Sequence, residues 1–228
     1  MYPARQQQIL EILQREHRMS VKKLAGLCRV SEMTIRRDLK EMEARNTVQR
    51  YHGGAVYAEE DALPIRYRDR LNAPTKKALA ESVRPYLRDG LSVFIDSSST
   101  CAYILPLLAE YTDVQVVTNS VHNLLIAARY HCPCLLCGGE YQDRDMCTVG
   151  EEVERMLAQV NIDVGFFSSL GLSEEGIISD AEPRENRVRK IALLHTDTKV
   201  FLFDRSKVGR KYLYTLCRTD EVDRVIVV

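Results

Sequence analysis

The sequence lacks long hydrophobic runs, a leader-like N-terminus and an excess of charge of either sign. Its longest purely apolar stretches are a handful of residues, too short to cross a bilayer, so we expect no membrane partner. The first residues, MYPARQQQIL, have no apolar segment with a cleavage site, which predicts a cytoplasmic protein. What is present is 228 residues that are 45% hydrophobic, enough for a small domain and a larger one with its own core.

A regular cysteine framework is also missing, although the chain has seven cysteines. Without an export signal they are expected to be reduced thiols. Cys132, Cys134 and Cys137 follow His131 and raise the question of a metal site. In a strand, the first two of these thiols share one face and the third takes the other, which is poor geometry for one tetrahedral site. We therefore expect no metal and no cofactor.

The net charge of zero hides an uneven distribution of charge along the chain. Residues 1–57 contain 11 Lys and Arg against 6 Asp and Glu, whereas the remainder contains 21 against 26. A basic segment before an acidic one is expected when one domain meets phosphates and the other does not. The alternative is a chance fluctuation in a short segment. The residue patterns within the segment are therefore needed to choose between the two interpretations.

Three short amphipathic helices are predicted within the basic segment. Apolar residues recur at helical spacing from Arg5 to about His17, which predicts the first helix. Ser20 and Ser31 are typical N-cap residues, and each precedes a further helical pattern, the last running to about Asn46. Two short helices joined by a tight turn have the geometry of a helix-turn-helix.

The last of these helices has two chemically different faces. Ile35, Leu39 and Met42 lie on one face and are expected to pack against the first two helices. The opposite face carries three cations toward its N-terminal half, a distribution suited to the major groove of DNA. Asp38 lies beside the apolar face, so we interpret it as a structural partner for a neighbouring donor. The outward-facing residues are Met33, Arg36, Arg37 and Lys40.

Taken alone, this charged face is more typical of a solvated helix than of a DNA reader, but the following segment favours the second interpretation. Residues 48–57, VQRYHGGAVY, are β-prone and interrupted by Gly-Gly, which predicts a hairpin. A basic, aromatic hairpin directly after such a helix is typical of a winged helix-turn-helix. We therefore predict that residues 1–57 bind double-stranded DNA. The predicted contact residues are Ser20, Ser31, Met33, Thr34, Arg36, Arg37, Lys40, Arg50, Tyr51, His52 and Gly53.

The rest of the chain predicts a linker and one α/β domain. Residues 58–74, AEEDALPIRYRDRLNAP, are charged, contain two prolines and lack sustained periodicity, as a linker does. Across 75–228, apolar strand patterns alternate with helical ones, which predicts a mainly parallel sheet covered on both faces. Strands are expected at 91–95, 114–117, 133–136, 161–167, 199–203 and 225–228, and helices from about 75 and at 101–109, 121–130, 151–159 and 183–195.

Polar or glycine-rich residues follow several of these strands at their carboxyl ends, where ligands bind in such sheets. The first group, Asp96 to Thr100, is rich in hydroxyls and leads into a helix, as an anion site does. Lys207, just past a later strand, can supply the counter-charge for a phosphate. Ser-rich turns are usually only caps and a single lysine is usually solvated, so the prediction rests on their coincidence at one edge. The predicted effector-binding residues are Asp96, Ser98, Ser99, Thr100, Thr118, Asn119, Ser120, Gly138, Gly139 and Lys207.

The run from Ser31 to Leu39, with Arg5 upstream and the hairpin downstream, resembles the DeoR family of bacterial transcriptional regulators. The resemblance extends to Lys76, Gly150, Glu185 before Val188, and the strand-end groups. It implies a sensor domain similar in fold to ribose-phosphate isomerases and coenzyme A transferases, which binds a phosphorylated sugar. By the same resemblance, the Asp96 group and Lys207 hold phosphate or hydroxyls, while Thr118, Asn119 and Gly139 line the pocket.

Two residues depart from the family pattern. Ser98 stands in the first loop where the family often has glycine, and Ser168 stands after the Phe166-Phe167 strand where glycine is also common. Each adds a side chain where backbone would otherwise approach a ligand. Such side chains either narrow the pocket or supply two hydroxyl donors, so the departures bear on the identity of the effector.

Catalysis is the competing interpretation of the larger domain. Asp96, Asp180, Glu185 and Lys207 include the carboxylates that an aldose–ketose isomerisation needs to move a proton. No nucleophile–base pair stands out, and a sensor derived from an enzyme fold needs the ligand contacts without the base. We therefore expect a regulator rather than an enzyme. Repression is the commoner mode in the family, so we expect a repressor, and we expect its affinity for DNA to change when the effector binds. Paired half-sites in an operator further imply a homo-oligomer, either a dimer or a tetramer.

Overall fold

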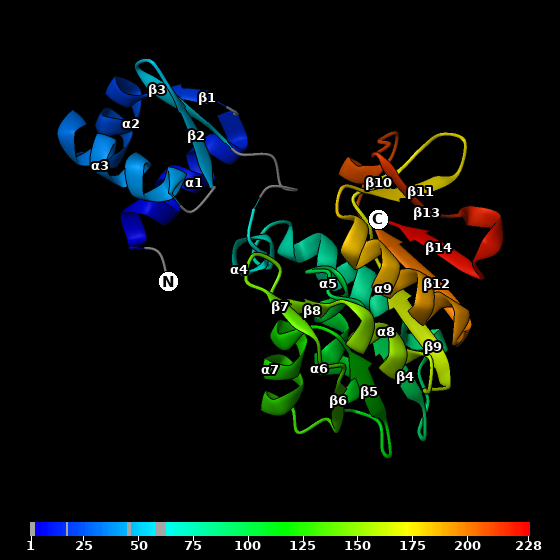
Figure 1. Cartoon of the computed structure of the whole chain (residues 1–228). Coiled ribbons are helices and arrows are strands. Elements are labelled where there is room, and N and C mark those ends of the chain that lie inside the picture. The colour runs from blue at the N-terminus through cyan, green and yellow to red at the C-terminus, as the bar shows by residue number, and fades with distance from the viewer. Residues whose placement is uncertain (1–2, 17, 45–46, 58–62) are drawn as a thin grey trace. The chain divides into compact units, whose positions relative to one another are not determined.

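The computed structural model describes residues 3–16, 18–44, 47–57 and 63–228. The chain divides into two compact units, Met1–Arg68 and Asp69–Val228 (Figure 1). The predicted linker spans this division: its residues 58–62 lie outside the described ones, and a short helix, α4 (Ile65–Arg68), follows them. Among the described residues, no helix is both long and apolar enough to cross a membrane.

Before α4, the described part of the first unit contains the three helices and the hairpin that the sequence predicts. Its elements before α4 are α1 (Ala4–Glu16), β1 (Arg18–Ser20), α2 (Val21–Cys28), α3 (Glu32–Glu43), β2 (Val48–Tyr51) and β3 (Gly54–Tyr57). Ser20 and Ser31 cap α2 and α3, because each hydroxyl accepts a 3.2 Å hydrogen bond from a backbone N–H of the first turn. Arg29 makes the turn between these helices in the left-handed conformation, with φ 53°.

The hairpin of β2 and β3 is extended by a third strand, β1, which the sequence does not predict. β1 pairs with β3 in the order β1-β3-β2, so the segment before α2 lies against the hairpin. Gly53 turns the chain at φ +91°, a conformation that other residues rarely adopt. A Cβ on Gly54 would lie 2.5 Å from the Met19 carbonyl oxygen, so only glycine allows β1 to approach this closely.

One buried apolar cluster joins the three helices, and an ion pair joins α1 to α3. Ile35, Leu39 and Met42 pack in the cluster, which confirms their prediction as the inner face of α3. Asp38 accepts two hydrogen bonds from the Arg5 guanidinium, at 2.5 Å from Nε and 3.1 Å from Nη2. Asp38 is therefore the predicted structural partner, and it holds α1 against α3.

The second unit is built on a six-stranded parallel sheet, which confirms the predicted α/β class. Its strands are β4 (Ser92–Ile95), β5 (Gln115–Thr118), β6 (Cys134–Leu136), β9 (Ile162–Phe167), β12 (Thr196–Phe203) and β14 (Arg224–Val227). Their order is β14-β12-β9-β4-β5-β6, and each neighbouring pair is parallel. The chain thus starts each half of the sheet at its centre, with β4 and with β9, and adds later strands outward.

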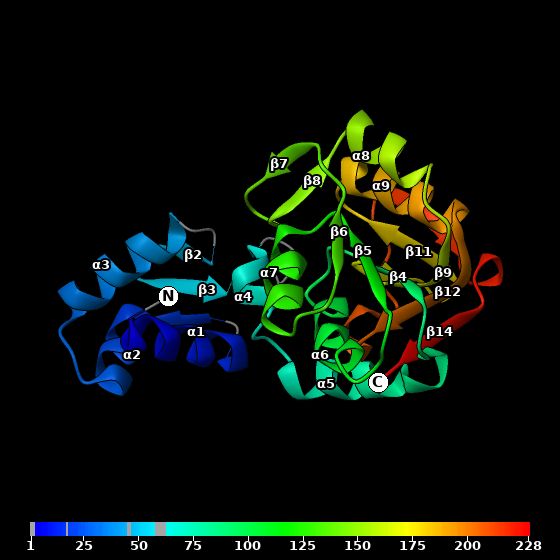
Figure 2. The same cartoon turned by 90° about the horizontal axis from the view of Figure 1, so that it is seen from below.

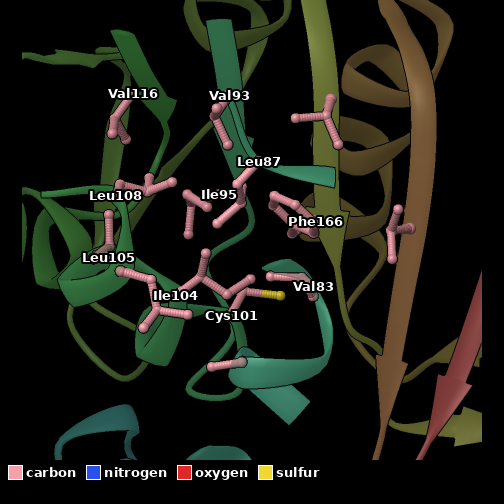
Figure 3. Close-up of a cluster of buried hydrophobic side chains, with 14 of the residues drawn as sticks. Val83, Leu87, Val93, Ile95, Cys101, Ile104, Leu105, Leu108, Val116 and Phe166 are labelled. Atoms are coloured by element: carbon pink, nitrogen blue, oxygen red, sulfur yellow. The ribbon is translucent and has the colours of Figure 1, made fainter. Parts of the chain in front are cut away.

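Helices cover both faces of this sheet (Figure 2). They are α5 (Ala73–Ser82), α6 (Leu105–Leu108), α7 (Val121–Arg129), α8 (Glu151–Leu157) and α9 (Pro183–Leu194), with 3-10 turns η2 (Arg84–Tyr86) and η3 (Cys101–Ile104). Alternate strand residues enter different cores: Val93 and Ile95 pack with α5, η3 and α6 (Figure 3), whereas Phe94 packs with α8 and α9. The continuous helix predicted at 101–109 is instead η3 followed by α6, because Pro106 lacks the N–H that such a helix needs.

Two antiparallel additions complete the second unit, and neither was predicted. The first is a hairpin of β7 (Glu140–Gln142) and β8 (Cys147–Val149). The second is a three-stranded sheet of β10 (Gly171–Leu172), β11 (Ile177–Asp180) and β13 (Tyr214–Arg218), with η4 (Arg205–Lys207) and η5 (Thr219–Glu221) nearby in the chain. Both additions follow a strand of the main sheet and therefore frame its carboxyl edge.

Candidate functional site

The outward face of α3 is as exposed as the sequence predicts. Met33 is 80% exposed, and Arg36, Arg37 and Lys40 are exposed as well. The Arg36 guanidinium lies 3.5 Å from the Glu32 carboxylate one turn earlier. A surface pair of this kind contributes only about 0.3–0.5 kcal/mol, so it does not withhold Arg36 from a phosphate or a base.

Three predicted DNA-contact residues already have structural roles in the free protein. The Ser20 hydroxyl binds the Lys23 N–H, and the Ser31 hydroxyl binds the Thr34 N–H. The Ser31 and Thr34 hydroxyl oxygens are also 2.9 Å apart, within hydrogen-bond distance. Direct DNA contact by these hydroxyls remains a prediction, whereas their part in starting α2 and α3 is observed.

The hairpin residues predicted to touch DNA lie beside α3. Arg50, Tyr51, His52 and Gly53 are exposed and, with Arg36, line a groove of about 390 Å³ between helix and hairpin. This groove brings together residues from both predicted DNA-contact segments.

One acidic side chain in this groove was not anticipated. Glu43 accepts hydrogen bonds from Arg50 at 2.6 Å from Nε and 3.0 Å from the backbone N. The side-chain bond and then the backbone bond lower the pKa of Glu43, so its carboxylate stays ionised. A phosphate must therefore compete with Glu43 for Arg50. The sequence gives no sign of this ion pair, because its two residues are seven positions apart and lie on different elements.

The predicted effector loops meet where the strand order of the main sheet reverses. Asp96 follows β4 and Ser168 follows β9, the two central strands. The Ser168 N–H donates to Asp96 Oδ2 at 3.2 Å, and the Asp96 N–H donates to the Phe166 carbonyl at 3.1 Å. Open α/β sheets bind ligands at this switch point, outside the carboxyl ends of the strands.

Arg189, on α9, is the centre of a buried ionic cluster beside this point. Its guanidinium donates to Asp96 at 3.0 Å, to Asp180 at 3.1 Å and to Glu185 at 3.1 Å. Burial opposes ionisation of Asp180, but Arg189 and several hydrogen bonds outweigh it, so the pKa of Asp180 is lowered. All three carboxylates that were catalytic candidates in the sequence are thus ion-paired with one cation.

Two lysines bond to hydroxyls at the switch point. Lys76, on α5 and only 1% exposed, donates to Ser99 at 3.0 Å. Lys207, on η4 and half-buried, donates to Ser168 at 3.4 Å. Ser168, one of the two departures from the family pattern, therefore supplies a hydroxyl to this arrangement.

The remaining predicted effector residues are mostly engaged with backbone. Ser98 accepts from the Cys101 N–H at 3.1 Å, and Thr118 donates to the Ile95 carbonyl at 2.6 Å. Asn119 donates to the Thr148 carbonyl at 2.8 Å, while its Oδ1 is buried without a hydrogen-bond partner among the described residues. Ser120 caps α7 through the Asn123 N–H at 3.1 Å. Thr100 is buried at the end of the first loop.

The two glycines after β6 differ in what surrounds them. A Cβ on Gly138 would meet nothing within 4 Å. A Cβ on Gly139 would lie 2.7 Å from both the Val149 carbonyl oxygen and Val153 Cγ2. The Gly139 position therefore requires glycine for the close approach of β8 and α8, before any ligand is considered.

Arg189 and Lys76 are functional candidates absent from the predicted effector-binding residues, although Lys76 is among the residues that carry the family resemblance. Arg189 follows Glu185 at i, i+4 on a helix rich in charge, which is the only sequence signal for their pairing. Lys76 lies in the second turn of a helix far from any strand end in the sequence, so strand-end reasoning does not reach it. The packing of α5 and α9 onto opposite faces of the sheet brings both side chains to the switch point.

The cysteine run is part of the core rather than of either surface. All seven cysteines are free thiols. Burial, and then the neighbouring thiols, raise the pKa of Cys134 and of Cys137 to about 11, so both are protonated at neutral pH. No group of three or more His, Cys, Asp or Glu side chains within the described ranges is arranged to hold a metal ion.

A winged helix-turn-helix with an exposed cationic helix, followed by an α/β unit with polar strand ends, defines a DNA-binding regulator with a sensor domain. Residues 5–61 match the DeoR-like helix-turn-helix domain, and residues 71–227 match the DeoR C terminal sensor domain. The chain belongs to the DeoR family of transcriptional regulators, which confirms the resemblance seen in the sequence.

Relatives of known name lie within this family. Over 221 residues the chain is 26% identical to the glycerol-3-phosphate regulon repressor of Escherichia coli (strain K12), across 95% of this chain and 87% of that protein. Over 233 residues it is 28% identical to the L-fucose operon activator of the same strain, across 99% and 95%. A solved D-ribose-5-phosphate isomerase in complex with phospho-erythronic acid matches with TM-score 0.46 and 20% identity, over 60% of this chain and 54% of that one. Both a repressor and an activator are thus among the relatives.

Proposed function

We propose that this protein is a transcriptional repressor whose affinity for operator DNA is controlled by a sugar phosphate bound at the β4/β9 switch point. The observation that carries the proposal is the pairing of Lys76 with Ser99 and of Lys207 with Ser168. Ser99 belongs to the Asp96 loop, and the Ser168 N–H bonds to Asp96, so both ammonium groups serve one site. Two ammonium groups among hydroxyls are suited to a phosphate dianion.

The same site offers acceptors for the hydroxyls of a sugar. Asn119 follows β5 and Asp204 follows β12, and their Oδ1 and Oδ2 atoms are buried acceptors without a hydrogen-bond partner among the described residues. A buried acceptor left unpaired costs about 1–3 kcal/mol, which a ligand hydroxyl recovers by donating to it. The presence of both cations and unpaired acceptors at these strand ends favours a phosphorylated polyol over inorganic phosphate.

Retained isomerase chemistry is the weaker alternative, because the carboxylates are engaged. A general base must be free to accept a proton from its substrate, whereas all three carboxylates are ion-paired with Arg189. In Asp96, one oxygen is bonded to Arg189 and the other to the Ser168 N–H. We therefore propose that the site binds its ligand without catalysing a reaction.

Repression, a homo-oligomeric state and a cytoplasmic location complete the proposal. A repressor among the relatives supports the first, although the L-fucose operon activator shows that relatives also activate. Two DNA-binding units on paired half-sites gain effective concentration, so a dimer or tetramer is expected. Its target, chromosomal DNA, requires a cytoplasmic protein.

Two measurements test the proposal separately. A thermal-shift screen with sugar phosphates and the matching unphosphorylated sugars should raise the unfolding temperature only with the phosphorylated members. Affinity for an operator duplex selected from a random library should fall as salt rises. A salt-independent affinity would refute DNA recognition by α3, and equal stabilisation by the unphosphorylated sugars would refute the phosphate assignment.

A further inference from the structure

Asp69 occupies the first position of the second unit, directly after α4. Two other elements hold this residue, one by its backbone and one by its side chain. The Tyr103 hydroxyl donates to the Asp69 carbonyl oxygen at 2.6 Å. His122 Nε2 lies 3.4 Å from Asp69 Oδ1, within ion-pair distance although not in hydrogen-bond geometry. The chain is therefore held at two atoms where it leaves the DNA-binding unit.

Each of the two partners lies immediately after a predicted effector loop. Tyr103 belongs to η3, which begins at the residue following the Asp96–Thr100 loop. His122 belongs to α7, whose N-cap is Ser120, the last residue of the loop after β5. A shift of either loop must displace the short helical element attached to it, because little flexible chain lies between them.

A third link joins the same incoming segment to the first loop. Lys76 lies on α5, which begins at Ala73, a few residues after Asp69. Its ammonium donates to Ser99 at 3.0 Å inside that loop. An entering phosphate competes with Ser99 for this ammonium, so ligand binding alters a bond between the loop and the incoming segment directly.

We propose that Asp69, Tyr103 and His122 form a coupling clamp that transmits occupancy of the switch-point site to the segment leading to the DNA-binding unit. This inference rests on the proposed function and adds to it a route of regulation. Effector binding moves the two loops, Tyr103 and His122 move with them, and Asp69 takes a different position in the two states. Such a device satisfies the requirement that a ligand stabilise one of two discrete arrangements.

The surroundings of the clamp leave room for this movement. Asp69, Tyr103 and His122 line an open pocket of about 590 Å³, together with Leu125 and Tyr130. The open side of this pocket gives the side chains space to shift, although the Tyr103 ring also packs against the core that contains Ile104. Burial, and then the Asp69 carboxylate, raise the pKa of Tyr103, so its hydroxyl remains a donor at neutral pH.

The full-length protein with Tyr103→Phe and His122→Ala tests the clamp. The probes are glycerol 3-phosphate, ribose 5-phosphate and fructose 6-phosphate, each measured by thermal shift and by its effect on affinity for the selected operator duplex. Coupled sites typically change affinity about 5- to 150-fold, and we expect the double variant to reduce that change to below about 2-fold. Its thermal shift should stay as in the wild-type protein. Tyr130→Phe is the matched control, because Tyr130 lines the same pocket and its hydroxyl bonds to no described residue.

Every outcome is decisive. A double variant that responds as strongly as the wild-type protein overturns the clamp while leaving the proposed function intact. Loss of the thermal shift in the variant also overturns it, because the residues then belong to the ligand site itself. If none of the three probes stabilises the wild-type protein, the proposed effector class is refuted, and the proposed clamp is refuted as well. If the double variant does not fold, Tyr103→Phe alone should reduce the coupling at least about threefold.

Discussion

The two units of the molecule use their cations in opposite ways. In the first, Arg36, Arg37 and Lys40 are exposed to solvent, and among the described residues this face is ion-paired with one surface glutamate, Glu32. In the second, Arg189 and Lys76 are buried and bonded to carboxylates or hydroxyls. An exposed cation gains affinity for a polyanion by releasing counterions, which salt suppresses, whereas a buried one is screened little. Burial therefore distinguishes the surface predicted to contact DNA from the site proposed to bind a small anion.

The largest expected effect follows from removing the buried cation. Arg189→Ala leaves three buried carboxylates without their counter-charge, which should cost about 3–5 kcal/mol of unfolding free energy. Urea titration followed by circular dichroism measures the loss. Arg187→Ala is the control, since this exposed arginine of the same helix pairs with Glu154 at the surface and should cost under about 1 kcal/mol. Equal losses in the two variants would contradict the contrast between buried and exposed cations.

The next effect concerns the exposed cations. Arg36→Ala with Arg37→Ala should weaken operator binding about 10²-fold and flatten its salt dependence, while unfolding stability changes by under about 0.5 kcal/mol. Fluorescence anisotropy at several salt concentrations gives both quantities. Arg15→Ala, an exposed arginine of α1 paired with Glu16, should leave operator binding unchanged. An operator affinity unaffected by the double change would exclude α3 as the reading helix.

A smaller effect is expected from the half-buried lysine at the switch point. Lys207→Ala removes a charge-assisted bond to a ligand phosphate and should weaken effector binding about 10- to 100-fold, with operator affinity preserved. Thermal shift against sugar-phosphate concentration reports the change. Lys211→Ala, on an exposed position four residues later, is the control. A Lys207 variant that remains fully responsive would remove this residue from the phosphate site.

The smallest effect is the pH dependence contributed by Asp180. Its pKa is lowered in the folded protein from the ordinary value of 3.8, so its contribution is complete above that pH and is lost as pH falls through the folded pKa. The stability difference between the wild-type protein and Asp180→Asn should thus be constant from pH 7 to about 5 and shrink below pH 3.8. Urea titrations at pH 7, 5 and 3 test this. A difference that grows toward pH 3 would reverse the assigned sign.

Much of this architecture could be predicted because its signals are local. Short apolar runs predicted the parallel strands, and helical spacing with caps predicted most of the helices, to within a few residues. The apolar face of α3 identified Asp38 as structural. The family resemblance supplied most of the assignment of ligand type.

What the sequence could not predict depends on contacts between distant segments. β10 has 2 residues, too short for a periodic pattern, and β13, the partner of β11, comes much later in the chain. Arg189 and Lys76 enter the site only through packing of α9 and α5, which periodicity does not specify. Gly139 was assigned to a ligand pocket by its place after a strand, whereas its immediate neighbours are β8 and α8.

The central position of β4 also has a consequence during synthesis. Ser92, its first residue, bonds through both its N–H and its hydroxyl to Asp163, 71 residues further along. The site at the β4/β9 boundary therefore cannot exist until the ribosome has released β9, long after the N-terminal unit is complete, and domains fold in the order in which they emerge. A nascent chain thus acquires its DNA-binding surface before it can sense a metabolite.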